Sequence, residues 1–251
     1  MVTNTGWSGK EMCTILHLLK SIHFPILSIL LIITLFSTIL VLIIAFKYGY
    51  NTMFIAGSVG GFLILLATSG FLWVYGKRTS QMGSSLIVKD AITLGILLGI
   101  LWIVEISINN FIAPPLPARD IVDNIFWIMI AVSIFVFATV CAFREESIRV
   151  GVVVGIWSGF VSGVLACCMA LSLIVFAMHF ITQDPLNIAE WAARGTDTNA
   201  PTMAAYFAYE TFAGAFLHLV VLGVFMGLLL GLLGGTVGIV IKATCRWILR
   251  P

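Results

Sequence analysis

Long apolar stretches alternate with short polar segments along this chain. A bilayer core of about 30 Å is crossed by roughly 20 helical residues, and six stretches reach that length. The pattern therefore predicts six transmembrane helices, over Pro25–Phe46, Thr52–Gly76, Ala91–Ile112, Ile121–Phe143, Val150–Phe180 and Tyr206–Ile241.

The composition supports a membrane protein. Apolar residues make up 61% of the 251 residues and charged residues only 10%, against about 25% charged in a typical soluble domain. The mean hydropathy is +1.13. A soluble fold of this size cannot keep so much apolar surface from water, so we predict an all-α polytopic protein whose solvent is the lipid bilayer. A soluble enzyme, a nucleic-acid-binding module and a disordered chain are excluded, and the net charge of +2 suggests no polyanionic partner.

The basic residues predict the orientation, because loops on the cytoplasmic side of a membrane carry an excess of Lys and Arg. Three of the thirteen basic residues, Lys47, Arg119 and Arg194, fall on one side of the six predicted spans. We therefore expect both termini in the cytoplasm and the protein in the plasma (inner) membrane. The other ten basic residues fall on the side of the termini: Lys10, Lys20, Lys77, Arg78, Lys89, Arg144, Arg149, Lys242, Arg246 and Arg250.

Two segments outside the predicted spans also suggest helices. Residues 1–23 form a cytoplasmic arm, whose mixture of apolar and charged residues suits an amphipathic helix on the membrane surface or, alternatively, a disordered tail. Residues 24–251 form the transmembrane domain. Within it, a short outer surface helix is expected near 184–195, with Asp184 as its N-cap, Pro185 in its first turn and Gly195 at its end.

Glycines recur at four-residue spacing on three of the predicted spans. This spacing returns to nearly the same face of a helix and lets another backbone approach closely. We therefore predict glycine-rich helix-helix seams that hold the fold or an oligomer together, with sliding surfaces of a gate as the alternative. The glycines are Gly95, Gly99, Gly151, Gly155, Gly159, Gly163, Gly223, Gly227, Gly231 and Gly235.

Glu105 is the most informative polar residue, because a carboxylate inside a membrane span is costly and has to face protein or a water-filled cavity. Asn109 lies four residues later, on nearly the same helical face. Further polar residues at similar depth are His179, Glu210 and His218. We expect these five residues to line an outward-facing polar vestibule for an ion, a proton or a solute. The alternative is a set of ordinary hydrogen bonds between helices.

The sequence offers little support for catalysis or a cofactor. No HxxxH or HExxH motif is present, so we assign no metal site and no cofactor. The run from Glu145 to Arg149 is one residue short of the first motif of CAAX-type intramembrane proteases. Ser158 and His218 fall at different depths of the membrane, unlike a rhomboid-type pair. We assign no catalytic residue and expect a protein that is not an enzyme.

Three functions fit these features. The first is a transport-type protein, either a small permease or the membrane subunit of a transporter. In topology alone, the predicted spans and termini resemble the membrane subunits of ABC-2-type exporters. The second is a non-catalytic subunit that packs against other membrane subunits or against copies of itself. The third is a membrane enzyme or redox protein.

Overall fold

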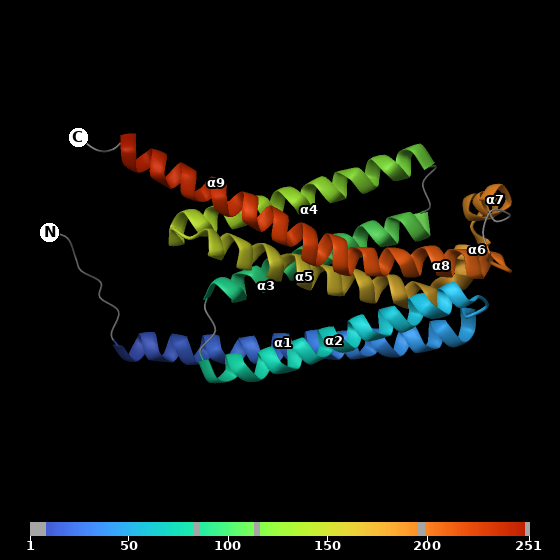
Figure 1. Ribbon diagram of the computed structural model, residues 1–251, viewed down its shortest axis with the longest axis horizontal. Helices are drawn as coiled ribbons and strands as arrows, with labels where there is room; N and C mark the ends of the chain where they lie inside the picture. The colour runs from blue at the N-terminus through green and yellow to red at the C-terminus, as the bar shows by residue number, and fades with distance from the viewer. Residues whose placement is uncertain (1–8, 83–85, 113–115, 195–198, 249–251) are drawn as a thin grey trace.

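The computed structural model describes residues 9–82, 86–112, 116–194 and 199–248, and within these ranges the chain is helical without any strand. Figure 1 shows the helices packed as one elongated bundle. The elements are α1 (Gly9–Tyr48), α2 (Thr52–Met82), α3 (Leu86–Ser107), α4 (Leu116–Glu145), α5 (Ile148–Ser172), α6 (Met178–Gln183), α7 (Pro185–Arg194), α8 (Met203–Phe216) and α9 (Gly227–Ile248), together with the π-helical segments η1 (Ile108–Ile112), η2 (Leu173–Ala177) and η4 (Leu217–Met226).

Six helices in the described ranges are long and apolar enough to cross a membrane. Large apolar side chains project from them, among them Phe46, which is 96% exposed, and Ile32, which is 64% exposed. Such surfaces are stable in lipid and unfavourable in water. The protein is therefore an all-α polytopic membrane protein, as the hydropathy pattern predicts.

The helix boundaries differ from the predicted ones. The helix that contains the first span begins at Gly9 and continues to Tyr48 without a break, and α3 begins at Leu86, before the predicted Ala91. The ends of a helix are set by its backbone hydrogen bonds, not by where its apolar residues begin. These hydrogen bonds continue through charged residues such as Lys89 and Asp90. The position of the N-terminal arm on the membrane surface remains a prediction.

The last two spans are longer than a membrane is thick. The fifth runs from Ile148 to Gln183, over 36 residues, and the sixth from Met203 to Ile248, over 46 residues. At about 1.5 Å per residue, both exceed a hydrocarbon core of about 30 Å. Each contains a π-helical segment, η2 in the fifth span and η4 in the sixth. The two spans therefore either cross at a tilt or project from the membrane.

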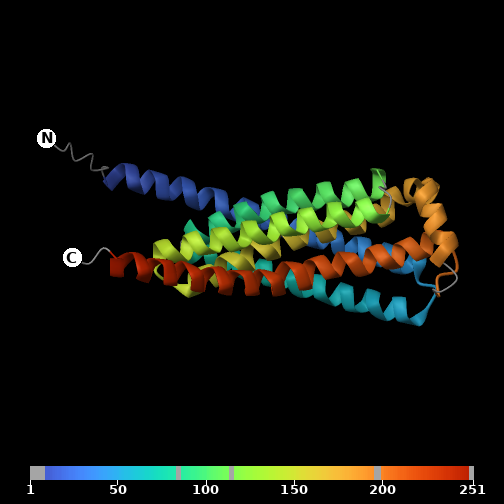
Figure 2. The same ribbon diagram turned by 90° about the horizontal axis from the view of Figure 1, so that it is seen from above.

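The start of α1 and the end of α9 lie at the same end of the bundle. The first turns of α1 and the last turns of α9 extend beyond the other helices there, and α7 lies across the opposite end (Figures 1 and 2). Asp184 starts α7, because its Oδ1 accepts a hydrogen bond of 2.8 Å from the backbone N–H of Leu186. We call the two ends of the bundle the terminal end and the α7 end.

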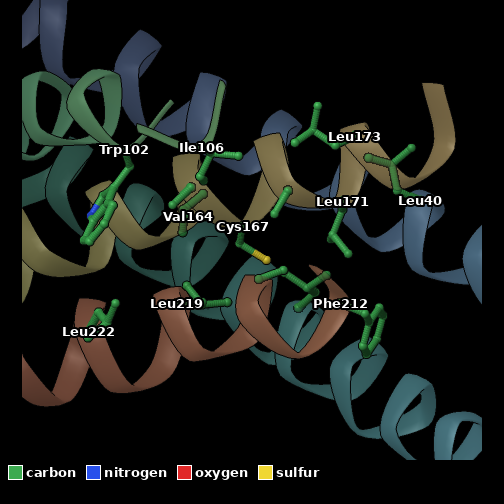
Figure 3. Packing of buried hydrophobic residues seen from close by; sticks show 14 of the residues in the cluster. Leu40, Trp102, Ile106, Val164, Cys167, Leu171, Leu173, Phe212, Leu219 and Leu222 are labelled. Carbon is green, nitrogen blue, oxygen red and sulfur yellow. The ribbon is translucent and has the colours of Figure 1, made fainter. Parts of the chain in front are cut away.

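Helix α5 is the centre of the bundle and contacts α1, α3, α4, α8 and α9. In Figure 3, the α5 side chains Val164 and Cys167 lie between Ile106 of α3 and Leu219 of η4, and Leu171 lies near Leu40 of α1 and Phe212 of α8. Cys167 and Leu171 are fully buried. The apolar core thus follows one central helix, whereas the hairpin of α1 and α2 lies along one side of the bundle (Figure 1).

Glycines bring the backbones of α5 and of η4–α9 close together. A Cβ atom on Gly151 would lie 2.6 Å from Cα of Gly235, and one on Gly163 would lie 2.8 Å from the carbonyl oxygen of His218. On α3, a Cβ on Gly95 would lie 2.7 Å from the side chain of Val161. Real Cβ contacts are not this short, so a larger residue at these positions requires the helices to move apart.

Candidate functional site

A polar cavity of about 330 Å³ lies among α3, α4, α5, α7 and α8, toward the α7 end of the bundle. We call it the polar cavity. Its polar walls contrast with the apolar core just described. It is lined by Glu105, Ile106, Asn109, Asn110, Arg119, Asp123, Ala170, Ile181, Asn187, Glu190, Phe207, Glu210, Thr211, Gly214 and His218.

Two carboxylates in the wall share a single hydrogen-bond donor. The side-chain nitrogen Nδ2 of Asn109 donates to Oε1 of Glu105 at 2.6 Å and to Oδ1 of Asp123 at 2.5 Å. Glu105 is only 5% exposed. Two acidic side chains held this close in a poorly solvated place create a strongly negative potential, which favours a cation or a shared proton between them.

His218 closes one side of the cavity against two indole rings. Its ring lies 4.6 Å from that of Trp102, at an interplanar angle of 90°, and 6.3 Å from that of Trp127. Its Nδ1 lies 2.7 Å from the carbonyl oxygen of Gly214. A carbonyl oxygen can only accept, so Nδ1 carries a hydrogen, and Nε2 of the neutral ring is left as an acceptor.

Helix α7 covers the cavity and is fixed to the bundle by polar contacts. Arg119 Nη1 pairs with Glu190 Oε2 at 3.4 Å, and the hydroxyl of Tyr206 donates to Glu190 Oε1 at 3.3 Å. Nδ2 of Asn187 donates to the backbone carbonyl of Ile181 at 2.9 Å. Because Glu190 and Asn187 line the cavity themselves, a movement of α7 would change its shape.

Four buried side-chain polar atoms of the described chain lack a hydrogen-bond partner, and all four belong to residues that line this cavity: Glu105 Oε2, Asn109 Oδ1, Arg119 Nε and His218 Nε2. A buried polar atom without a partner costs roughly 1–3 kcal/mol. Concentrating four such atoms around one space is typical of a site that binds water or a polar ligand.

Two of the π-helical segments supply residues to the cavity. Asn109 and Asn110 belong to η1, and His218 belongs to η4. In such segments the backbone is wound more widely than in an α-helix, and they occur frequently at functional sites. Both segments thus contribute polar residues to the same space.

The structure brings together four of the five residues proposed from the sequence. Glu105, Asn109, Glu210 and His218 all line the cavity, and the Glu210 side chain is also exposed at its rim. His179 is not among the lining residues. It is exposed, and its ring lies 5.7 Å from that of its neighbour Phe180.

Sequence reasoning missed three charged residues of the site. Arg119 enters the prediction from sequence only through the orientation rule, and neither Asp123 nor Glu190 is among the residues predicted for the vestibule. The signal for Asp123 was its spacing of four residues from Trp127, which places a carboxylate and an indole on one face of α4. Glu190 carried no comparable signal, since its position depends on the way α7 folds over the bundle.

The cavity is acidic overall. Glu105, Asp123, Glu190 and Glu210 line it, against Arg119 as a single lining cation. The described residues contain no group of three or more His, Cys, Asp or Glu side chains that could hold a metal ion. The arrangement therefore suits a ligand that carries positive charge and is recognised by hydrogen bonds.

No protein-family model matches this chain, and no curated protein or solved structure is significantly similar to it.

Proposed function

We propose that this membrane protein is of the transport type, either a small permease or the membrane subunit of a transporter, and that the polar cavity holds a small cationic solute during passage. The observation that carries this proposal is the buried carboxylate of Glu105, which lines a cavity of about 330 Å³ and has an oxygen without a hydrogen-bond partner. Ionisable residues inside membrane spans are expensive, and they typically mark pathways for substrates or ions.

The surroundings of Glu105 support a binding role over a purely structural one. A structural carboxylate in a helix bundle has its hydrogen-bonding capacity filled by neighbouring groups. Glu105 instead has one oxygen bonded to Asn109 and the other unpartnered, beside a second carboxylate, Asp123. A cation in the cavity would satisfy the free oxygen and relieve the repulsion between the two acids.

We further propose that the cavity opens to the outside of the plasma (inner) membrane and that both termini lie in the cytoplasm. The support is the small number of basic residues toward the α7 end, against the ten that the sequence pattern assigns to the other side. A variant that keeps Cys245 alone of the five cysteines tests this, because Cys245 is exposed near the terminal end. A membrane-impermeant maleimide should label it only after the cells are permeabilised, and labelling of intact cells would reverse the orientation.

The transport proposal is tested by charge movement. Purified protein in proteoliposomes on a solid-supported membrane is exposed to steps of Na⁺, K⁺, ammonium and ethanolammonium chloride. At least one of these cations should evoke a current, and Glu105→Gln should reduce it about tenfold or more, since the loss of a charged hydrogen-bond partner costs roughly 1.5–3 kcal/mol.

Glu145→Gln is the matched control, because Glu145 is an exposed carboxylate at the terminal end of α4 and lies outside the cavity. Its current should equal that of the unmodified protein. Absence of current from every cation, with the protein folded and inserted, would reject a transport role for the isolated chain.

A non-catalytic subunit of a larger membrane complex is the second candidate, and a specific observation favours it. An apolar groove of about 480 Å³ runs between α2 and α8, lined among others by Gly57, Gly60 and Phe216. Ideal Cβ atoms on Gly57 and Gly60 would meet nothing within 4 Å, so another helix could approach closely there. Stoichiometric partners that co-migrate in a mild detergent would favour this role, and an isolated, monodisperse protein would count against it.

A further inference from the structure

The unpartnered atoms of the polar cavity have defined hydrogen-bonding roles. Glu105 Oε2 is an acceptor when the acid is ionised. Asn109 Oδ1 is an acceptor because the other side-chain atom, Nδ2, faces two carboxylate oxygens, which fixes the orientation of the amide. His218 Nε2 is an acceptor because Nδ1 donates to a carbonyl. Three of the four unpartnered atoms of the described chain are thus acceptors.

These acceptors belong to one wall of the cavity. Asn109 bonds directly to Glu105. Trp102 precedes Glu105 by three residues on α3, about one helical turn, and the ring of Trp102 packs against that of His218. The carboxylate, the amide and the imidazole therefore belong to neighbouring side chains of one wall of the cavity.

A primary ammonium group matches this wall. It has three N–H donors and one positive charge, as the side chain of lysine does, and the wall offers three acceptors beside a pair of carboxylates. A hard metal ion fits poorly, because Na⁺, Mg²⁺ and Ca²⁺ prefer oxygen ligands and His218 offers nitrogen. A transition metal fits poorly because the described residues provide no set of three suitable ligands.

The rest of the cavity indicates what the ammonium group is attached to. Nε of Arg119 is an unpartnered donor, and Arg119 precedes Asp123 by four residues on α4, about one helical turn. A ligand whose ammonium group lies near Asp123 needs a hydrogen-bond acceptor about one helical turn away to reach Nε of Arg119. Ile106, Ile181 and Phe207 supply apolar surface for a few carbon atoms between the two groups. The volume of about 330 Å³ is at the small end of ligand sites, which run from roughly 300 to 1,000 Å³.

We propose that the polar cavity recognises a small solute with a primary ammonium group and a neighbouring hydroxyl or carboxylate, of the amino alcohol or amino acid class. The ammonium group donates to Glu105, Asn109 and His218, and Nε of Arg119 donates to the second group. This assignment rests on the proposed function in one respect only, which is that the cavity is a solute site.

Calorimetric titration of the full chain in detergent tests the assignment with a series of probes. Ethanolammonium chloride has both recognition groups, ethylammonium chloride lacks the hydroxyl, and tetramethylammonium chloride has the same charge without any N–H donor. Ethanolammonium should bind tightest, ethylammonium more weakly, and tetramethylammonium at least about tenfold more weakly than ethanolammonium, since each missing hydrogen bond to a charged group leaves a buried atom unsatisfied. Equal binding of the three probes, no binding of ethanolammonium, or tighter binding of K⁺ would overturn the proposal.

Two variants locate the binding. Glu105→Gln should weaken ethanolammonium binding about tenfold or more, and His218→Phe should weaken it several-fold while keeping an aromatic ring against Trp102. If the Glu105→Gln protein does not fold, His218→Phe alone tests whether the amine binds in the polar cavity. Unchanged affinity in a folded variant would place the binding elsewhere and reject the assignment.

These titrations fail independently of the transport experiment. Amine binding that depends on Glu105, without any current in proteoliposomes, would keep the ligand assignment and remove the transport function. A current carried by K⁺ alone, without amine binding, would keep the transport function and reject the ligand assignment.

Discussion

Glu105 and Asp123 accept hydrogen bonds from the same atom, Nδ2 of Asn109. The two acids come from α3 and α4, and the amide that joins them belongs to η1, immediately after α3. One neutral side chain thus holds two acidic groups together at the wall of the polar cavity. No donor reaches Oε2 of Glu105 while both acids are ionised, and this is the atom that a ligand would use.

Removing this donor should destabilise the protein. In Asn109→Ala both carboxylates lose their shared hydrogen bond while they remain close, and we expect the free energy of unfolding to fall by about 2–4 kcal/mol, since a hydrogen bond to a charged group contributes roughly 1.5–3 kcal/mol and repulsion is added. Thermal unfolding in detergent measures the change. Adding Glu105→Gln to this variant should restore part of the loss, because the charge repulsion is then gone.

Asn124→Ala is the matched control for that experiment. Asn124 is exposed on α4, and its side chain bonds only to the backbone oxygen of Asp120 in the same helix. Its effect should stay within about 0.5 kcal/mol, as is usual for surface substitutions. An Asn109→Ala protein as stable as this control would show that the shared donor has little structural importance.

Much of the fold follows from the sequence, because the cost of placing polar residues in lipid determines where spans can occur. The hydrogen bond between Glu105 and Asn109 also follows, since residues four apart share a helical face. The partnership with Asp123 and the cover by Glu190 do not follow from the sequence. They depend on how helices pack against one another, and no periodicity within a single helix specifies this.

His179 illustrates a second limit of prediction from sequence. The sequence places it at a membrane depth similar to that of the other polar residues, but η2 at Leu173–Ala177 interrupts the α-helix shortly before it. A π-helical segment has i→i+5 hydrogen bonds and rotates the residues that follow relative to an α-helix. His179 is consequently exposed beside Phe180, outside the polar cavity. Short apolar sequences carry no clear mark of such a segment.

Because the backbones of α5 and η4–α9 are in close contact, we predict that even a methyl group at Gly159 destabilises the fold. A Cβ there would run into the carbonyl oxygen of Gly223 and would lie 3.1 Å from Cα of Gly227. Gly159→Ala should lower the free energy of unfolding by about 1–3 kcal/mol, the usual cost of overpacking. Thermal unfolding in detergent again provides the measurement.

Gly70→Ala is the comparison for the glycine contact. Gly70 lies within α2, and a Cβ added to it would meet nothing within 4 Å. Alanine there should be neutral or slightly stabilising, since Ala is the better helix former by roughly 0.5–1 kcal/mol. If both alanine variants unfolded at the same temperature, the packing at Gly159 would have to be looser than the structure indicates.

Removing a hydrogen bond at the end of α1 should reduce the stability of the protein by a smaller amount. The hydroxyl of Tyr209 on α8 donates to the backbone oxygen of Tyr48 at 3.1 Å, across 161 residues of sequence. Tyr48 is buried, and its oxygen also accepts from the N–H of Tyr50 at 2.8 Å, so it is not left without a partner when the hydroxyl is removed. Tyr209→Phe should therefore cost only about 0.5–1.5 kcal/mol, the net contribution of one neutral hydrogen bond. A loss above about 3 kcal/mol in the same unfolding assay would indicate a role beyond this bond.

At Glu146, between α4 and α5, we predict that a glycine variant is more stable than an alanine variant. Glu146 has a positive φ of 53°, and the N–H of Ser147 bonds to the carbonyl of Ala142, the pattern of a helix end that usually carries glycine. Its carboxylate pairs with Arg246 and with Lys242, the latter at 3.7 Å. All three side chains are partly or largely exposed, so the pairs contribute at most about 1 kcal/mol.

Glu146→Ala loses the ion pairs and keeps the strained backbone conformation, whereas Glu146→Gly loses the ion pairs and relieves the strain. The glycine variant should therefore be the more stable by about 1 kcal/mol in thermal unfolding. If the alanine variant were the more stable, the left-handed conformation at this position would have to be abandoned, because alanine is favoured over glycine where the backbone is helical.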